Sequence, residues 1–312
     1  MKIVTIGGGT GQFRMLSSLK DLPVEITAIV SMADSGGSTG RLRDEYGVLP
    51  PGDVLKCLIA LSPFDQARDI LQSRFGGEGK LKQHNAGNLL LVFLSQYLSG
   101  DFAQAVEALG QILQIKGKVL PVTTDKATLV AELEDGTFLN GETEIDVVHG
   151  ERKSKIKRIF LVPHNSKLEV YAPVMTAIAE ADFVLIGPGD IYTSIIPNLL
   201  VPGLVAALQN TKAQVIYFPN IMTKFGESDD FTTEDFILVV EKYLQRQVDQ
   251  IIANETMPEA LVIEKYLLEN AKPVVISSDD ERIVRADLLT EGSLARHDIE
   301  KLKQIIKKHL GI

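Results

Sequence analysis

Residues 2–13, KIVTIGGGTGQF, carry a β-branched run into a glycine-rich turn. The run over 2–6 predicts a strand, and residues 12–20 have the pattern of an amphipathic helix. This order is typical of doubly wound α/β proteins, in which the N–H groups of the turn and the helix N-terminus face a phosphate. The stretch therefore predicts both a fold and an anion-binding loop.

The spacing of the glycines does not match a known nucleotide-binding fingerprint, although their position after a strand suits a phosphate loop. Counting G-x-G-x-x-G from Gly7 puts Gln12 at the third glycine, and Walker A fails because no Gly-Lys pair follows. We interpret the turn as a generic phosphate loop. The alternative is a tight turn that needs glycine only for its backbone angles. The predicted ligand-binding residues of this loop are Gly7, Gly8, Gly9, Thr10 and Gly11.

Similar β-branched runs recur towards both ends of the chain, separated by helical patterns. They lie at 25–30, 182–187, 214–219, 249–254 and 273–277. Strand–helix–strand units imply right-handed crossovers and a mostly parallel sheet with helices on both faces. We therefore predict an α/β fold: a doubly wound, three-layer, Rossmann-type sheet within a single domain spanning residues 1–312.

Two segments in the middle of the chain depart from this alternation. Residues 54–115 have the pattern of successive helices, with Asp101 as the N-cap of the last one. Residues 118–162 have the pattern of a β-meander, with turn signals at 134–136 and 140–142. We predict a helical excursion followed by a small antiparallel β insertion.

The composition is that of a globular protein and argues against several functional classes. Hydrophobic residues make up 45% of the 312 residues, enough apolar surface for a large core. A net charge of −9 disfavours nucleic-acid binding, which needs a basic surface. The single cysteine, Cys57, excludes an internal disulfide and a cysteine-rich zinc site. No apolar run approaches the ~20 residues of a membrane span and no signal-peptide core is evident, so we expect a cytoplasmic protein.

A second candidate loop, MADSGGSTGRLRDEYGVLPPGD over residues 32–53, follows the second predicted strand. Asp34 lies near the position at which dinucleotide folds hold a ribose, and the glycines after it can form a nest of amides for an anion. Two arginines can add charge-assisted contacts to phosphate. The alternative is a solvated loop with incidental charges. The predicted ligand-binding residues here are Asp34, Gly36, Gly37, Ser38, Thr39, Arg41 and Arg43.

Three further polar loops supply candidate residues. They are KQHNAGNLLL at 82–91, IGPGDIYTSIIPNLL at 186–200 and PNIMTKFGES at 219–228. The last two follow predicted strands, and loops at the carboxyl ends of parallel strands converge on one ligand. A lone histidine is more often structural than catalytic. The candidates for ligand binding are His84, Asn88, Gly189, Asp190, Asn220 and Thr223.

Seven ordered blocks, spread over nearly the whole chain, carry a resemblance to one protein family. They are GGGTG, ADSGGSTGRLR, PPGDVLKCLIAL, HNAGN, GPGDIYTSIIPNLLVPG, NIMTKFGESD and LARHD. The chain resembles the gluconeogenesis factor (YvcK-like) branch of the 2-phospho-L-lactate transferase (CofD-like) family. The resemblance implies a CofD-like three-layer fold and a role in carbon metabolism, cell-wall precursor supply and cell shape during gluconeogenic growth. It also implies binding of UDP-sugars, notably UDP-N-acetylglucosamine.

The resemblance implies roles for three residues. Thr10 matches a position expected to touch nucleotide phosphate, whereas Tyr266 and Arg296 match positions linked to UDP-sugar binding. From chemistry alone, Tyr266 is a helix-surface aromatic and Arg296 is a residue at a helix start. In the family picture the tyrosine stacks on a base or sugar, and the arginine pairs with the diphosphate.

Three positions depart from the family pattern. Many relatives carry two consecutive acids where this chain has Asp34 and Ser35, and losing the second carboxylate weakens a divalent-metal site. Gln83 stands where a glycine commonly precedes the histidine, and Phe236 stands where relatives often place a histidine. None of these changes interrupts the phosphate loops.

We expect a regulatory protein that binds a UDP-sugar or another diphosphate nucleotide, requires no cofactor, and contacts a protein partner in cell-wall precursor metabolism. The sequence is compatible with a homo-oligomer. The alternative is a Mg²⁺-dependent transferase acting on a nucleotide or phosphate substrate, with Asp34 and Asp53 as metal ligands. If the chain is a regulatory protein, Asp53 is predicted to cap the next helix and not to bind a metal. A nicotinamide-dependent oxidoreductase ranks last, although loop composition does not separate UDP-sugars from NAD or GDP.

Overall fold

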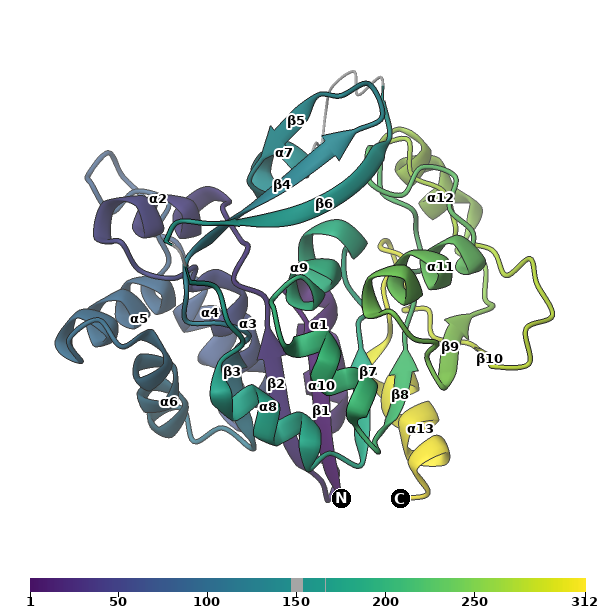
Figure 1. Cartoon of the computed structure of the whole chain (residues 1–312), viewed down its shortest axis with the longest axis horizontal. Coiled ribbons are helices and arrows are strands. Elements are labelled where there is room, and N and C mark those ends of the chain that lie inside the picture. Colours follow the sequence, from purple (N-terminus) through teal and green to yellow (C-terminus); the bar gives the residue numbers. More distant parts are fainter. Residues whose placement is uncertain (147–153, 166) are drawn as a thin grey trace.

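The computed structural model describes residues 1–146, 154–165 and 167–312. Within these residues the main sheet has seven parallel strands in the order β10-β9-β8-β7-β1-β2-β3, which confirms the predicted doubly wound α/β fold (Figure 1). The strands are β1 (Lys2–Gly7), β2 (Glu25–Val30), β3 (Lys118–Pro121), β7 (Phe183–Ile186), β8 (Gln214–Tyr217), β9 (Gln250–Asn254) and β10 (Ile283–Ala286). The chain builds outward from β1 to β3, and then from β7 to β10 on the other side. The topological switch point therefore lies between β1 and β7.

Helices cover both faces of this sheet (Figure 1). One layer contains α1 (Gly9–Leu19), α3 (Gly52–Leu61) and α13 (Ile299–Leu310). The other contains α8 (Ala172–Ala179), the π-helical turn η1 (Ile191–Ile195), α9 (Ile196–Leu199), α10 (Leu204–Asn210) and α11 (Thr233–Leu244). A further helix, α12 (Ala260–Leu267), follows β9.

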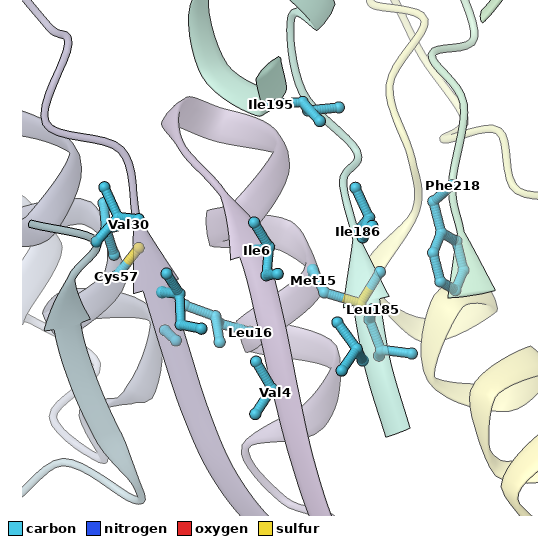
Figure 2. Packing of buried hydrophobic residues seen from close by; sticks show 14 of the residues in the cluster. Val4, Ile6, Met15, Leu16, Val30, Cys57, Leu185, Ile186, Ile195 and Phe218 are labelled. Atoms are coloured by element: carbon cyan, nitrogen blue, oxygen red, sulfur yellow. The ribbon is translucent and has the colours of Figure 1, made fainter. Parts of the chain in front are cut away.

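The core lies between these layers. Val4 and Ile6 of β1 are almost fully buried, and Met15 and Leu16 of α1 belong to the same cluster (Figure 2). Cys57 of α3 is buried there as well, and burial raises the pKa of its thiol. Parallel strands read as continuous apolar runs because both of their faces are covered. The packed central strands give the loops at their carboxyl ends a rigid base.

The antiparallel insertion forms a small lobe with the strand order β5-β4-β6 (Figure 1). It consists of β4 (Ala127–Leu133), β5 (Phe138–Asn140), the short helix α7 (Glu142–Ile145) and β6 (Ile156–Pro163). Its predicted start was wrong: β3 pairs with β2 in the parallel sheet. After the helical excursion the chain returns to the free edge of β2. Residues 118–121 pair with β2 there, before the lobe begins. Residues 147–153 of the predicted meander lie outside the described residues.

The predicted helical excursion is confirmed. After α3 it comprises α4 (Ala67–Leu71), α5 (Ala86–Tyr97) and α6 (Phe102–Ile112). Asp101 caps α6 as expected, since its carboxylate accepts a hydrogen bond from the backbone N–H of Gln104 at 2.9 Å.

Residues 32–53 are not one continuous loop, because they contain the helix α2 (Gly37–Tyr46). Gly47 ends this helix in the left-handed region, at φ 61°, and its N–H donates to the carbonyl oxygen of Arg43. The capping prediction for Asp53 was also wrong. Pro51 occupies the N-cap of α3, and Asp53 is a buried residue of the first helical turn without a capping hydrogen bond.

Residues 273–277, predicted as a strand, do not join the sheet. The N–H of Val274 donates to the carbonyl oxygen of Ile221, and the carbonyl oxygen of Val275 accepts from the N–H of Thr233. The backbone groups of this segment are thus bonded to the loop after β8 and to the start of α11. The edge beside β9 is taken by β10 instead.

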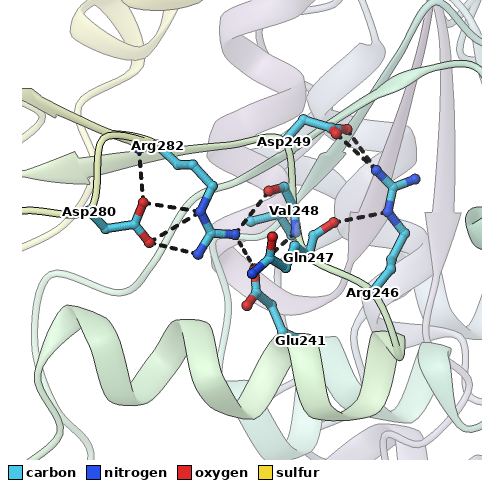
Figure 3. Close-up of polar contacts among 7 residues, drawn as sticks. All are labelled: Glu241, Arg246, Gln247, Val248, Asp249, Asp280 and Arg282. Atoms are coloured by element: carbon cyan, nitrogen blue, oxygen red, sulfur yellow. Dashed lines mark hydrogen bonds and ion pairs between the residues drawn. The ribbon is translucent and has the colours of Figure 1, made fainter.

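Ion pairs hold this edge of the sheet at its amino end (Figure 3). Arg282, just before β10, contacts Glu241 of α11 and lies 2.6 Å from Asp280. Arg246 pairs with Asp249 at 2.9 Å, just before β9. This cluster lies at the opposite end of the strands from the loops described next.

No single helix of the described residues is both long and apolar enough to cross a membrane. One bent pair, 191–199 with 204–210, passes a combined test of length and composition, with a bend of 75° between its parts. Its apolar side chains, such as Ile195 and Leu204, belong to the main core.

Candidate functional site

The loops after β1, β7 and β8 open onto one cavity of about 400 Å³. The end of α12 and the segment before α13 complete its wall. Strand ends beside a topological switch point are where open α/β sheets bind ligands, and the volume is within the usual range for small-molecule sites. The lining residues are Thr10, Gly11, Arg14, Asp146, Pro188, Gly189, Asp190, Asn220, Ile221, Met222, Thr223, Lys224, Phe225, Tyr266, Glu269, Ala271, Ala295, Arg296 and His297.

Glycine allows two of these loops to touch through their backbones. A Cβ added at Gly11 would collide with the carbonyl group of Pro188, so only glycine lets the start of α1 approach the loop after β7 this closely. The N–H of Gly189 donates to the side-chain oxygen of Asn220 at 3.2 Å, which joins the β7 and β8 loops. The cavity therefore lies beside the N-terminus of α1, whose first amides have no helical partners.

Two arginines supply positive charge on one side of the cavity. Arg14 of α1 donates from Nη1 to the carbonyl oxygen of His297 at 2.8 Å, and its Nε is buried without a hydrogen-bond partner among the described residues. Burial and then the nearby charge of Arg296 lower the pKa of Arg14. His297 is neutral at physiological pH, because burial and the charge of Arg14 lower its pKa to about 3. Paired guanidinium groups are a typical phosphate-binding arrangement.

An ion cluster occupies the other side of the cavity. The ammonium group of Lys224 lies 2.7 Å from Asp146, 2.6 Å from Asp190 and 2.9 Å from Glu227. Burial opposes the charge of this lysine, but the carboxylates outweigh it, led by Glu227, and raise its pKa. Burial also raises the pKa of Glu227 to about 7, despite the neighbouring ammonium. Asp146 follows α7, so the cluster links the antiparallel lobe to the main sheet.

A second polar cluster lies on the other side of the first glycine loop. Asp34, Asp53 and Glu142 repel one another there. Burial first, and then the charge of Asp53, raise the pKa of Asp34. Burial first, and then Asp34, raise the pKa of Glu142 to about 9. Lys56 lies 3.0 Å from Asp53, and the attraction of that carboxylate raises the pKa of the lysine. One cation thus faces three carboxylic acids.

Gly8 lies between Asp53 of the acid cluster and the helical turn η1. A Cβ at this position would lie 2.6 Å from Oδ2 of Asp53 and 3.5 Å from Cβ of Ser194 in η1. Glu142, at the start of α7, accepts a hydrogen bond from the N–H of Ser35 at 3.0 Å. The short helix α7 therefore reaches both clusters: Glu142 belongs to one and Asp146 to the other.

The acid cluster is a candidate divalent-metal site. Carboxylate oxygens are ligands that Mg²⁺ prefers, and Asp34 and Asp53 both present them here. Across the described ranges, no group of three or more His, Cys, Asp or Glu side chains has a metal-binding arrangement. The two aspartates therefore fit Mg²⁺ only if a ligand such as a phosphate supplies further oxygens.

The cavity brings together the predicted residues of five loops and segments. Thr10, Gly11, Gly189, Asp190, Asn220, Thr223, Tyr266 and Arg296 all line it. Gly7 ends β1, Gly8 caps α1, and Gly9 adopts a left-handed φ of 64° at the helix start. Arg296 lies three residues before α13, near the helix start at which the sequence placed it.

The predicted residues of the second loop lie around the acid cluster instead. Gly36 donates its N–H to Asp34 at 2.8 Å and precedes the N-terminus of α2, where Gly37, Ser38 and Thr39 form the first turn. Both arginines of α2 are engaged by protein groups outside the cavity. Arg41 donates to the carbonyl oxygen of Lys82, and Arg43 pairs with Asp44.

His84 and Asn88 lie next to this second loop. The hydroxyl of Ser38 is 2.9 Å from Nδ1 of His84, and burial, followed by the charge of Arg41, lowers the pKa of that imidazole. The N–H of Asn88 donates to the side chain of Asn85, which caps α5. The side-chain oxygen of Asn88 is buried without a partner in the part of the chain that the structure describes.

Several charged residues of the site were not predicted from the sequence: Arg14, Lys56, Glu142, Asp146, Lys224 and Glu227. Arg14 lies one helical turn after the glycine loop, a spacing that could have pointed to it. Lys224 and Glu227 lie within the quoted loop at 219–228, but the two aspartates that pair with Lys224 come from distant segments. Nothing near Glu142 in the sequence signals its contact with the second loop.

Comparisons with known proteins identify the family. Residues 3–291 match the family model described as 2-phospho-L-lactate transferase CofD. Proteins named gluconeogenesis factor are 38% identical in Halalkalibacterium halodurans, over 97% of this chain and 95% of the relative, and 37% identical in Bacillus subtilis, over 98% and 96%. A crystal structure of a Bacillus halodurans protein, 36% identical, matches with a TM-score of 0.91 over 98% of both chains. Both the fold and the sequence therefore place the chain in the CofD family, among the relatives named gluconeogenesis factor.

Proposed function

We propose that the chain is a regulatory protein of carbon metabolism that binds UDP-N-acetylglucosamine in the cavity at the strand ends. The observation that carries the proposal is Arg14, whose buried Nε lacks a hydrogen-bond partner among the described residues and lies in the field of Arg296. A buried donor without an acceptor costs free energy. A diphosphate oxygen would provide that acceptor and would also offset the repulsion between the two guanidinium groups.

The other lining residues suit the rest of a nucleotide. The diphosphate lies beside the first amides of α1, near Thr10 and Gly11, between the two arginines. Tyr266 is half-buried against an apolar cluster that includes Met222 and Ala295, which holds its ring in place for stacking on the uracil.

The name gluconeogenesis factor, which the relatives carry, supports the link to carbon metabolism, and we extend the proposal to regulation of cell-wall precursor supply. Ligand binding reports the supply of cell-wall precursor and changes the contact with a protein partner in that metabolism. Such a population shift requires different ligand affinity in the two states. Under this proposal the protein is needed for cell shape during gluconeogenic growth.

Isothermal titration calorimetry with UDP-N-acetylglucosamine tests the binding step. We expect Arg296→Ala to weaken binding about 10- to 100-fold, the value of a hydrogen bond to a charged group. Arg285→Ala is the matched control, because Arg285 is an exposed arginine of β10 that does not line this cavity. Undiminished binding in Arg296→Ala, or no binding to the wild-type protein, would contradict the proposal.

A second candidate function is a Mg²⁺-dependent transferase of the kind described for the family. The acid cluster favours it, because a divalent cation would neutralise the repulsion among Asp34, Asp53 and Glu142. In that case the two aspartates would hold Mg²⁺ with oxygens of the substrate, and the metal would stabilise charge on a transferring phosphate group. Mg²⁺-dependent turnover of a nucleotide, lost in Asp34→Asn, is the expected result. Absence of turnover with GDP-, UDP- and NAD-type substrates would reject this function.

A further inference from the structure

The ion cluster around Lys224 has more hydrogen-bond acceptors than donors. One ammonium group, with three N–H donors, faces three carboxylates with six oxygens. Oε2 of Glu227 is buried and has no hydrogen-bond partner among the described residues. The cluster therefore has acceptor capacity that its own lysine cannot satisfy.

The two aspartates of the cluster are open to the cavity, whereas Glu227 is not. The side chains of Asp146 and Asp190 are 34% and 40% exposed, and both residues line the cavity, but the side chain of Glu227 is only 1% exposed. A ligand in the cavity can therefore reach the aspartates. Lys224 also lines the cavity and pairs with both aspartates, and the buried Glu227 pairs with Lys224.

The cavity is consequently bipolar. Arg14 and Arg296 present donors and positive charge on one side, and Asp146 and Asp190 present acceptors and negative charge on the other. A ligand that is anionic at one end and carries hydroxyl donors at the other end matches both sides. A free nucleoside diphosphate carries hydroxyl groups only on its ribose, on one side of the diphosphate, whereas a nucleotide-sugar carries them on both sides.

We propose that Asp146 and Asp190, positioned by Lys224, form a subsite for the hydroxyl groups of the sugar and so select glycosylated diphosphates over free ones. This inference rests on the proposed binding of a nucleoside diphosphate in the same cavity. Each aspartate accepts a hydrogen bond from a sugar hydroxyl, and the ammonium group of Lys224 holds both carboxylates in place. A site built to hydrogen-bond a hydroxyl rejects a ligand that lacks it, because its polar groups are left unpaired.

The test measures the affinities of UDP and UDP-N-acetylglucosamine by calorimetry, first in EDTA and then with added Mg²⁺. The variants are Asp146→Asn and Asp190→Asn, which are isosteric and relieve part of the negative excess, so the fold should persist. The control is Glu264→Gln, which removes a carboxylate from the surface of α12 without touching the cavity. We expect each aspartate variant to weaken UDP-N-acetylglucosamine binding about tenfold or more, and to leave UDP binding within about twofold.

The outcomes separate this inference from the function on which it rests. If neither ligand binds the wild-type protein, the proposed function fails and the subsite fails with it. If both ligands bind with equal affinity and the aspartate variants change neither, the subsite is rejected while nucleotide binding stands. If the variants weaken both ligands equally, or if UDP binding requires Mg²⁺ and is lost in Asp190→Asn, the aspartates serve the diphosphate or its metal, and the sugar role is overturned.

Discussion

Arg14 and His297 lie 283 positions apart in the chain, yet the guanidinium group of one donates to the backbone oxygen of the other at 2.8 Å. The contact joins the first helix to the segment that carries Arg296. It fixes the spacing of the two arginines on one side of the cavity, and it uses one nitrogen of Arg14 while another, Nε, stays without a partner among the described residues. The first and last parts of the site are thus assembled by one side chain.

Arg14→Lys should separate charge from geometry. Lysine keeps the positive charge but lacks the planar fork that reaches both the carbonyl oxygen and a phosphate. We expect affinity for UDP-N-acetylglucosamine to fall about tenfold and the free energy of unfolding to fall by about 1 kcal/mol. Calorimetry and urea denaturation measure the two effects. Arg68→Lys, on α4 beside Phe13, is the control. Wild-type affinity in Arg14→Lys would show that the fork is not used.

Gly11→Ala should destabilise the protein strongly. The new Cβ would collide with the backbone of Pro188, and backbone atoms cannot rotate away as a side chain can. We expect a loss of roughly 3 kcal/mol in the free energy of unfolding, the upper range for overpacking. Gly79→Ala is the matched control, because a Cβ there meets nothing within 4 Å. Equal stabilities of the two variants in urea denaturation would refute the close approach of α1 to the β7 loop.

Glu142→Gln should change how stability depends on pH. The folded-state pKa of Glu142 is about 9, well above the ordinary value of 4.5. The folded protein therefore holds a proton that the unfolded chain releases, and the free energy of unfolding falls as pH rises from about 4.5 to about 9. Glutamine removes this dependence. We expect the variant to be more stable than wild type at pH 8.5, by on the order of 2 kcal/mol, and similar to it at pH 4.5.

Urea denaturation at the two pH values measures this effect. The control is Glu134→Gln, an exposed carboxylate of the same lobe. A variant whose advantage over wild type is the same at both pH values would contradict the raised pKa. Added Mg²⁺ that abolishes the difference would support the transferase as a second function, since the metal would then neutralise the same carboxylates.

Tyr266 should contribute to ligand affinity through its aromatic ring and not through its hydroxyl group. Stacking of a base on an aromatic side chain is worth about 1–3 kcal/mol, so Tyr266→Ala should weaken UDP-N-acetylglucosamine binding roughly 10- to 100-fold. Tyr266→Phe keeps the ring and should bind within about twofold of wild type. Equal losses in both variants would assign the role to the hydroxyl group instead. Calorimetry on the two variants distinguishes the cases.

Much of the architecture could be predicted from the sequence, because it depends on local patterns. The β-branched runs at 2–6 and 25–30 are strands, and the polar loops after β1, β7 and β8 meet because the carboxyl ends of parallel strands meet. The strand prediction for 273–277 was wrong for a non-local reason. The backbone hydrogen bonds of this segment go to Ile221 and Thr233, and β10 occupies the sheet edge beside β9.

The helix α2 was missed for a different reason. Three glycines suggested a loop, but Gly40 is needed inside the helix, since a Cβ there would collide with the carbonyl group of Ser35. Gly47, in the left-handed conformation that often ends helices, was the signal that could have revealed it. Asp146 and Glu142 had no such signal, because only the position of the lobe brings them to Lys224 and to the second loop.

The short helix α7 begins at Glu142, which bonds to the loop after β2, and is followed by Asp146, which pairs with Lys224 after β8. The antiparallel lobe is therefore attached to the main domain at two points, and one of them, the Asp146–Lys224 pair, lies in the cavity where we propose that the ligand binds. Allosteric coupling is reciprocal in free energy. If a partner protein binds the outer face of the lobe and shifts it, the affinity of the cavity for its ligand changes. By reciprocity, the ligand then changes the affinity for the partner by the same factor. A partner bound to the lobe can thus alter ligand affinity without contacting the cavity.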